Sequence, residues 1–119
     1  MPLSGNSEFG NEKLETILRE IELRLPRNFG IIDSLSTLNE KALDIVNDTY
    51  IDHMTANLVI SFRITGGELT NLLGGGGSCL GTIDFDNGRC VRFIHMATGK
   101  VCQMVIVSGG TPSLSIIKE

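Results

Sequence analysis

A histidine and a cysteine in the C-terminal half are the two side chains that could perform nucleophilic chemistry together. If Asn87-Gly88 and Thr98-Gly99 form the turns of two consecutive hairpins, His95 faces Cys102 on the neighbouring strand. A cysteine activated by a histidine also needs a third polar group to orient the imidazole. This register brings no such group near the pair, so we interpret it as a buried histidine beside an unreactive cysteine and expect no catalytic residue.

The remaining metal-ligating and acidic residues lack the spacing of a functional site. Cys79, Cys90 and Cys102 are far apart in the chain, whereas zinc ligands usually come in close pairs such as CxxC. Asp84 and Asp86 adjoin the predicted turn, where aspartate commonly accepts hydrogen bonds from turn amides. The sequence therefore predicts no metal, no cofactor and a protein that is not an enzyme, although a small enzyme using Cys102 and His95 stays open as an alternative.

Length and charge restrict the class of protein further. The chain has 119 residues, enough for one domain, and 10 Lys+Arg against 14 Asp+Glu give a net charge of −4. An acidic chain has little general attraction for phosphate backbones or anionic membranes. Three cysteines are too few for a disulfide scaffold, and neither a signal peptide nor an apolar run of about 20 residues is present. We expect an intracellular protein, cytoplasmic or nuclear, that does not bind a membrane.

A sheet that binds nucleic acid is the main alternative function. Arg89, Arg92 and Lys100 could form a small basic strip on the predicted hairpins. Proteins that bind single strands also need exposed aromatic rings, and aromatic residues make up only 5% of this chain. Nucleic acid is therefore the weaker hypothesis for the partner.

Two segments have the composition of engineered sequence. Residues 74–78 read Gly-Gly-Gly-Gly-Ser, the unit of a flexible linker, and no phosphate-binding motif accompanies them. Residues 1–10 resemble the short vector-derived sequence that cloning leaves at an N-terminus. The natural sequence would then be 11–73, a helix-helix-hairpin segment, and 79–119, an antiparallel hairpin segment that completes the same domain. The linker either replaces a loop of one protein or joins two proteins in a fusion.

Helical periodicity predicts two helices in the first half. The first covers 11–25 and ends before Pro26. Its apolar stripe, which also has the 4-3-4 spacing of a coiled-coil seam, is Leu14, Ile17, Leu18, Ile21 and Leu25. A turn at Arg27–Gly30 precedes a second helix starting near Thr37, which has capping-box spacing to Glu40. The buried stripe of this second helix is Leu35, Leu38, Ala42, Ile45 and Val46.

The period changes to two after Ala56, which predicts strands. Leu58, Ile60, Phe62 and Ile64 form one buried face, Gly66-Gly67 a hairpin turn, and 68–73 a weak return strand. A turn centred on Asn87-Gly88 pairs Ile83 with Arg92 and Thr82 with Phe93. A turn at Gly109-Gly110 then leads into a last strand over 114–117.

In this register both faces of the sheet are apolar, although two helices can cover only one. The first face carries Leu80, Val91, Phe93, Met104 and Ile106. The second face, which we predict to bind protein, carries Ile83, Phe85, Arg92, Ile94, Gln103, Val105 and Val107. The expected fold is α+β, with two N-terminal helices on an antiparallel sheet of about five or six strands. The expected function is a non-catalytic adaptor or assembly domain that binds another protein or itself.

Overall fold

The fold is a mixed α+β domain with one sheet. The structure is a computed structural model of the 119-residue chain, and it describes residues 13–18, 21, 25–47, 57–84 and 89–119. Among these residues no helix is long and apolar enough to cross a membrane. The elements follow in the order β1 (Arg27–Ile32), α2 (Leu35–Val46), β2 (Leu58–Ile64), α3 (Gly67–Leu73), β3 (Gly77–Asp84), β4 (Cys90–His95), β5 (Val101–Val105) and β6 (Leu114–Lys118).

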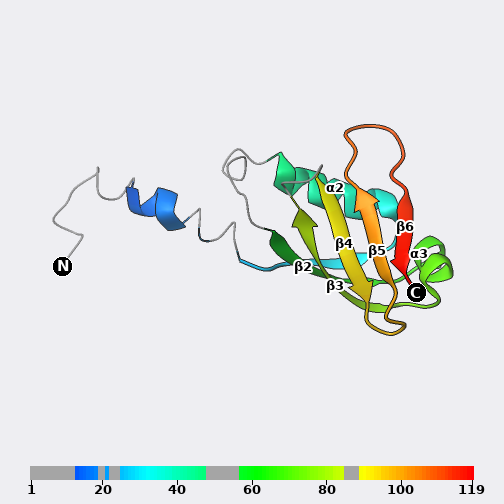
Figure 1. Cartoon of the computed structure of the whole chain (residues 1–119). Coiled ribbons are helices and arrows are strands. Elements are labelled where there is room, and N and C mark those ends of the chain that lie inside the picture. The colour runs from blue at the N-terminus through cyan, green and yellow to red at the C-terminus, as the bar shows by residue number, and fades with distance from the viewer. Residues whose placement is uncertain (1–12, 19–20, 22–24, 48–56, 85–88) are drawn as a thin grey trace.

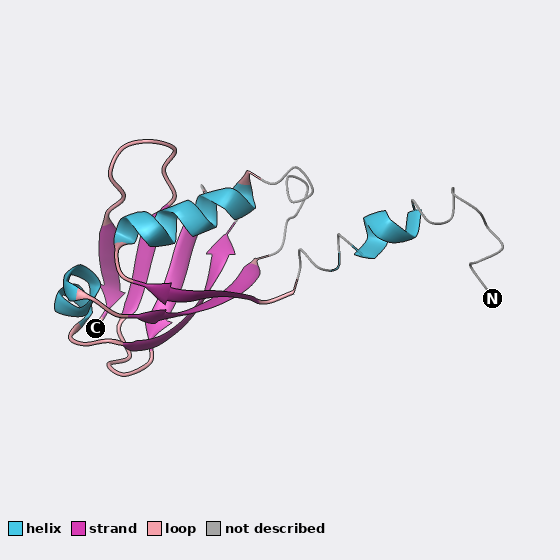
Figure 2. Cartoon of the chain, turned by 180° about the vertical axis from the view of Figure 1, so that it is seen from behind, coloured by secondary structure: helices cyan, strands magenta, loops and turns pink. Residues whose placement is uncertain are grey.

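The six strands lie in the sheet in the same order as in the sequence. β1 and β2 are parallel, and every later neighbour is antiparallel. A parallel pair needs a crossover connection, and α2 supplies it by lying across one face of the sheet (Figure 1, Figure 2). The antiparallel sheet of hairpins is therefore confirmed for β2–β6. The turn predicted at Arg27–Gly30 is wrong, since these residues belong to β1.

The local sequence of α2 explains where it starts and which side it buries. Its N-cap is Ser34, whose hydroxyl accepts a hydrogen bond from the Thr37 amide at 3.2 Å, so the helix begins at Leu35 and not at Thr37 as predicted. The predicted stripe is confirmed as the buried side of this helix. The buried side of α2 also includes a polar side chain, Asn39, which exchanges two hydrogen bonds of 2.9 Å with the backbone N–H and carbonyl of Val107. This amide pairing ties α2 to the end of β5.

The first predicted helix is only partly described. Residues 13–18 and Ile21 are helical, and the rest of 11–25 apart from Leu25 lies outside the described residues. The predicted apolar stripe, Leu14 to Leu25, is exposed on the described residues, with between 36% and 54% of each side chain accessible. The second predicted helix, α2, packs on the sheet together with α3, and packing of the first predicted helix on the sheet is not confirmed.

A short helix replaces the return strand predicted over 68–73. α3 buries Leu69 and Leu73, which are four residues apart, and ends at Gly74 in the left-handed conformation with φ of 82°. The amides of Gly74 and Gly75 both donate to the Thr70 carbonyl. The carboxylate of Glu68 accepts the Leu35 amide at 3.3 Å, which satisfies a free N–H in the first turn of α2. The glycine pair at 66–67 thus starts a helix and not a hairpin.

The glycine-rich segment 74–78 is an ordered part of the fold. Gly77 and Ser78 begin β3 and pair with Ile64 and Arg63 of β2. A Cβ at Gly76 would lie 2.9 Å from the Ile64 carbonyl oxygen, so this position has no room for a side chain. The segments on either side therefore form one continuous sheet. An engineered origin for 74–78, and for 1–10 outside the described residues, stays a prediction.

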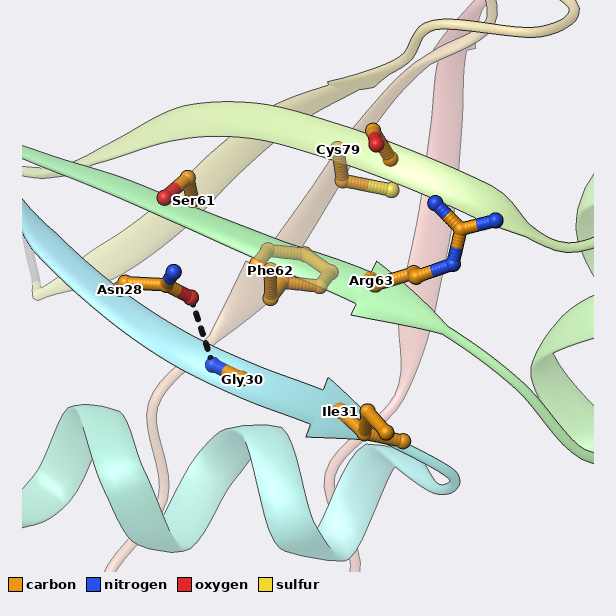
Figure 3. A pocket seen from close by; sticks show the side chains of 8 residues that line it. Asn28, Gly30, Ile31, Ser61, Phe62, Arg63 and Cys79 are labelled. Atoms are coloured by element: carbon orange, nitrogen blue, oxygen red, sulfur yellow. Dashed lines mark hydrogen bonds between the residues drawn. The ribbon is translucent and has the colours of Figure 1, made fainter.

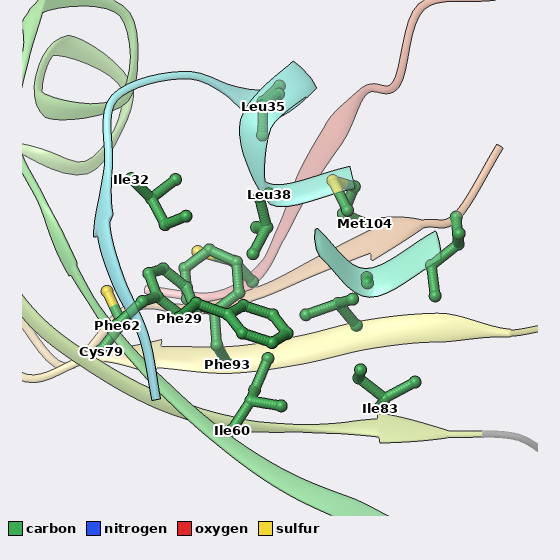
Figure 4. Packing of buried hydrophobic residues seen from close by; sticks show 14 of the residues in the cluster. Phe29, Ile32, Leu35, Leu38, Ile60, Phe62, Cys79, Ile83, Phe93 and Met104 are labelled. Carbon is green, nitrogen blue, oxygen red and sulfur yellow. The ribbon is translucent and has the colours of Figure 1, made fainter. Parts of the chain in front are cut away.

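The core lies between α2 and the inner face of the sheet, which we call the covered face (Figure 4). Every strand contributes to it, and Phe62 and Phe93 contact edge to face with ring centroids 5.0 Å apart. Both rings are buried, as predicted. The covered face carries Phe29, Ile32, Leu58, Ile60, Phe62, Ile64, Cys79, Ile83, Val91, Phe93, His95, Cys102 and Met104.

Gly81 makes the close approach between β3 and β4 possible. It pairs with Phe93, and a Cβ at this position would lie 2.0 Å from the Arg92 carbonyl oxygen and 2.6 Å from the Phe93 Cβ. We expect Gly81→Ala to lower the free energy of unfolding by about 2–4 kcal/mol, because backbone atoms must move to admit the methyl group. Urea denaturation followed by circular dichroism measures this change.

Gly67→Ala is the matched control for that substitution. Nothing lies within 4 Å of a Cβ at Gly67, and the residue begins α3. Alanine there should leave stability unchanged or raise it by about 0.5–1 kcal/mol, since alanine loses less backbone entropy in a helix. Equal stabilities of the two variants would contradict the pairing of Gly81 with Phe93.

Candidate functional site: the open face of the sheet

The outer face of the sheet, which we call the open face, is not covered by α2 or α3 (Figure 1). Alternation along the strands decides which side chains it carries, because each buried residue of the covered face is followed by one that points outward. Its members are Val59, Ser61, Arg63, Ser78, Leu80, Thr82, Asp84, Arg92, Ile94, Val101, Gln103, Val105, Ser115 and Ile117, together with Lys118, which pairs with Val101 where the β5–β6 register shifts.

Apolar residues of the open face line up across the strands. Leu80 pairs with Ile94, Ile94 pairs with Val101, and Ile117 on β6 lies next to the partner of Val101. Leu80 is 49% exposed and Ile117 is 52% exposed. We call Leu80, Ile94, Val101 and Ile117 the apolar row. It runs from β3 to β6, so it offers a continuous strip of aliphatic surface to another molecule.

A polar row runs parallel to this strip. Thr82 pairs with Arg92, Arg92 with Gln103, and Gln103 with Ser115. The Arg92 Nε donates a hydrogen bond of 2.9 Å to the Gln103 side-chain carbonyl, so the guanidinium is fixed over the sheet. Beyond this row lies Val105, which is 51% exposed. The open face therefore combines aliphatic area with oriented polar groups, as protein interfaces do.

A pocket lies between β1, β2 and β3, where the β1 register is irregular (Figure 3). Ser61, Arg63 and Ser78 of the open face line it together with Phe62 and Cys79 of the covered face. Its volume is about 330 Å³ and its lining residues are Asn28, Gly30, Ile31, Ser61, Phe62, Arg63, Ser78 and Cys79. The Asn28 side-chain oxygen accepts the Gly30 amide at 2.8 Å and holds the irregular part of β1. Arg63 is the one charged residue among the eight, and the serine hydroxyls accompany it. The pocket thus suits an acidic group of a bound partner.

The structure brings together four of the seven residues that we predicted to bind protein. Arg92, Ile94, Gln103 and Val105 all lie on the open face. Ile83 lies on the covered face and is fully buried, because it pairs with Val91 and not with Arg92. The predicted register of β3 against β4 is therefore wrong by one residue, and such a slip exchanges the two faces of a strand.

The other two predicted residues are not placed on the open face. Phe85 lies outside the described residues. Val107 follows β5, and both of its backbone polar groups bond to Asn39 of α2. The residues that the prediction missed are Leu80, Val59, Val101 and Ile117. The sequence signal for Leu80 was its neighbour Gly81, because a glycine within a strand marks a close approach of two backbones. Gly81 lies opposite Phe93, and Leu80 therefore points to the other face, which is the open face.

The predicted contact between His95 and Cys102 is also wrong. Cys102 pairs with Phe93, and His95 pairs with Cys79 across β3 and β4. Burial, together with the nearby Cys102, raises the pKa of Cys79 to about 12, and burial raises the pKa of Cys102. Both thiols are therefore protonated at neutral pH, and a protonated thiol is a poor nucleophile. In the described part of the chain, no cluster of three potential metal ligands occurs.

His95 has a structural position with both ring nitrogens bonded. Its Nε2–H donates to the Gly76 carbonyl at 3.0 Å, and its Nδ1 shares a hydrogen bond of 2.8 Å with the Thr98 hydroxyl. The Thr98 oxygen in turn accepts the Lys100 amide. This chain of hydrogen bonds attaches the glycine-rich segment to the turn between β4 and β5.

Comparisons with known proteins identify no relative. No protein-family model, no curated protein and no solved structure matches the chain.

We expect His95→Leu to lower the free energy of unfolding by about 1–3 kcal/mol, because the Gly76 carbonyl loses its buried donor. His95→Gln, which keeps an N–H donor, should recover part of this loss. Thr98→Val should also lower stability, because it leaves the buried Nδ1 of His95 without its hydroxyl partner. Chemical denaturation of the three variants measures the differences, and an unchanged stability of His95→Leu would show that the hydrogen bond to Gly76 is not made.

The pKa of Cys79 predicts how stability depends on pH. The folded-state pKa of about 12 lies above the ordinary value of 9.0, so folding favours the protonated thiol. The stability that this group contributes is complete below pH 9 and falls as the pH rises towards 12. We therefore expect Cys79→Ala to show a smaller loss of stability than the wild type between about pH 8 and about pH 10. Equal losses in urea titrations at the two pH values would contradict a buried Cys79 thiol.

Proposed function

We propose that this protein is a non-catalytic interaction domain that binds another protein chain through the open face of its sheet. The observation that carries the proposal is the apolar row, four aliphatic side chains aligned across β3 to β6 on a face that α2 and α3 leave uncovered. A contiguous apolar patch on a soluble domain commonly marks a binding surface.

The size of the patch is adequate for association. Leu80, Val105 and Ile117 are each about half exposed, and Val59 is 40% exposed. Together with the rest of the row they offer an apolar area on the order of a few hundred Å². At about 25 cal/mol per Å², covering such an area contributes several kcal/mol before the entropic cost of association is subtracted.

The polar groups of the open face favour protein over nucleic acid as the partner. Bases bind to sheets by stacking on exposed aromatic rings. The aromatic residues that the structure describes, Phe29, Phe62 and Phe93, all lie on the covered face and are buried. The open face instead offers aliphatic side chains, the Arg92–Gln103 pair and the pocket around Arg63.

The cysteines of the chain support an intracellular location for the protein and its partner. All three, Cys79, Cys90 and Cys102, are buried and free. Thiols stay reduced in the cytoplasm and nucleus, whereas secreted domains of this size commonly use their cysteines in disulfides. We therefore expect the partner to be an intracellular protein.

The proposal is tested with a photo-reactive benzophenone side chain placed at single positions of the full chain. Thr82 lies in the middle of the open face, and Asp44 lies exposed on α2, away from the sheet. Irradiation in cells should give protein adducts from position 82 and few from position 44. Leu80→Asp in the same chain should abolish the adducts, since a charge in the apolar row opposes burial. Equal adduct yields at both positions, or none at position 82, would refute the proposal.

A further inference from the structure

The pocket between β1, β2 and β3 is lined by hydrogen-bond donors that have no acceptor in the described part of the chain. The guanidinium of Arg63 and the hydroxyls of Ser61 and Ser78 make neither a hydrogen bond nor an ion pair with the residues that the structure describes. Asn28 uses its side-chain oxygen to accept the Gly30 amide at 2.8 Å, so its Nδ2–H groups also stay available. Donors from four side chains therefore adjoin one pocket, and its lining contains no carboxylate to accept from them.

The register around the pocket explains its shape. Arg63 has Ile31 and Ser78 as its partners on the two neighbouring strands, and Asn28 pairs with Ser61. β1 has one more residue than β2 between these two levels, which is a bulge. The serine side chains are short, so a hollow forms beside the longer side chains (Figure 3). Its volume of about 330 Å³ lies in the lower part of the range for ligand pockets and leaves room for an entire acidic side chain.

The charge of the pocket decides which kind of anion it suits. Of the eight lining residues Arg63 alone is charged, and its guanidinium can form two parallel hydrogen bonds with a carboxylate. The resulting pair is neutral, and the two serine hydroxyls supply further donors. A phosphate monoester carries a charge of about −1.5 to −2 at neutral pH, which one arginine does not balance. The lining therefore favours a carboxylate over a phosphate.

The pocket adjoins one end of the apolar row. Leu80, which is 49% exposed, pairs with Ser61, and Ser78 precedes it by two positions on the same face of β3. Two positions along a strand are about 6.6 Å apart. An extended segment of another chain covers the same distance with its own residues i and i+2. One short segment can thus fill the pocket and contact the apolar row together.

We propose that the pocket binds the side-chain carboxylate of an acidic residue in the partner protein, and that an aliphatic residue two positions away in the same segment packs on Leu80. The recognised segment is extended and reads acidic-x-aliphatic. Arg63 binds the carboxylate directly, and the two serines and Asn28 donate to its remaining lone pairs. This inference rests on the proposed function, because it names the chemistry of the segment that the open face binds.

The test is a titration of the isotope-labelled full chain with capped tripeptides, followed by the NMR chemical shifts of its backbone amides. The probe is acetyl-Glu-Ala-Leu-amide, in which capping leaves the glutamate carboxylate as the only charge. Acetyl-Gln-Ala-Leu-amide removes this charge and keeps the shape of the side chain. Acetyl-Glu-Ala-Ala-amide removes the aliphatic contact, and acetyl-phosphoserine-Ala-Leu-amide replaces the carboxylate by a phosphate.

We expect the glutamate probe to shift the amides of Gly30, Ser61, Arg63, Ser78 and Leu80 with a dissociation constant of about 1–10 mM. The glutamine and phosphoserine peptides should bind about fivefold more weakly or worse, because they lose the charge or exceed the one that Arg63 balances. The peptide that ends in alanine should bind about threefold more weakly and leave the Leu80 amide unshifted, since it buries less apolar area.

Substitutions in the chain separate the charge of the pocket from its geometry. Arg63→Gln should weaken binding of the glutamate probe about tenfold, and Arg63→Lys should recover part of the loss, because lysine keeps the charge but not the bidentate fork. Arg89→Gln is the matched control, since Arg89 is exposed and lies outside the lining, and it should leave the affinity unchanged. Ser61→Ala combined with Ser78→Ala keeps Arg63 and should weaken binding about threefold. This second variant decides the matter if Arg63→Gln does not fold.

Any of five results would overturn the inference. The glutamate probe shifts none of the named amides at about 50 mM. The glutamine peptide binds as tightly, the peptide that ends in alanine binds as tightly, or the phosphoserine peptide binds more tightly. The last is an unchanged affinity of both the folded Arg63→Gln chain and the double serine variant.

Failure of this inference is distinguishable from failure of the proposed function. If the benzophenone at position 82 forms adducts in cells and the glutamate probe does not bind, the open face binds protein and only the acidic-x-aliphatic segment is wrong. If the probe binds but position 82 gives no adducts, the proposed function fails, and with it the assignment of the carboxylate to a partner protein.

Discussion

The parallel pairing of β1 with β2 is the constraint on which the rest of the structure depends. A parallel pair cannot close with a hairpin, so the chain must cross one face of the sheet before it returns. That crossing contains α2, and its buried stripe fixes which face becomes the core. Every later strand joins by antiparallel pairing and adds no further long crossover. One face is therefore covered by a helix, and the other is left open.

The parts of the fold that periodicity specifies could be predicted from the sequence. The stripe of α2 and the alternation of β2 are both complete in the sequence, and burial follows them residue by residue. β1 and α3 could not be predicted in the same way. In β1 a glycine at position 30, with φ of 75°, interrupts the alternation. In α3, seven residues between glycines give too short a pattern to distinguish a helix from a strand.

The candidate site also has a part that the sequence predicted correctly and a part that it did not. The β4–β5 hairpin was placed with its faces correct, because its register differs from the prediction by two residues and an even shift keeps the faces. The β3–β4 hairpin differs by one residue, which moved Ile83 into the core and Leu80 to the open face. Turn composition does not fix such a register when the loop is longer than two residues. The steric requirement at Gly81 does fix it, since a side chain there would meet the backbone of β4.

The glycine-rich segment shows why composition alone misjudges local order. Gly74 ends α3 in a left-handed conformation, Gly76 packs against the Ile64 carbonyl, and Gly77 starts β3. Gly74 and Gly77 have positive φ angles of 82° and 121°, whereas Gly76 has no room for a Cβ. His95 then bonds the Gly76 carbonyl from β4. These contacts order the segment, and its engineered origin stays a prediction. The segment joins α3 directly to β3 and so fixes where β3 begins. That starting point decides that Ser78 and Leu80 lie on the open face. The apolar row thus depends on the same glycines that resemble a linker in the sequence.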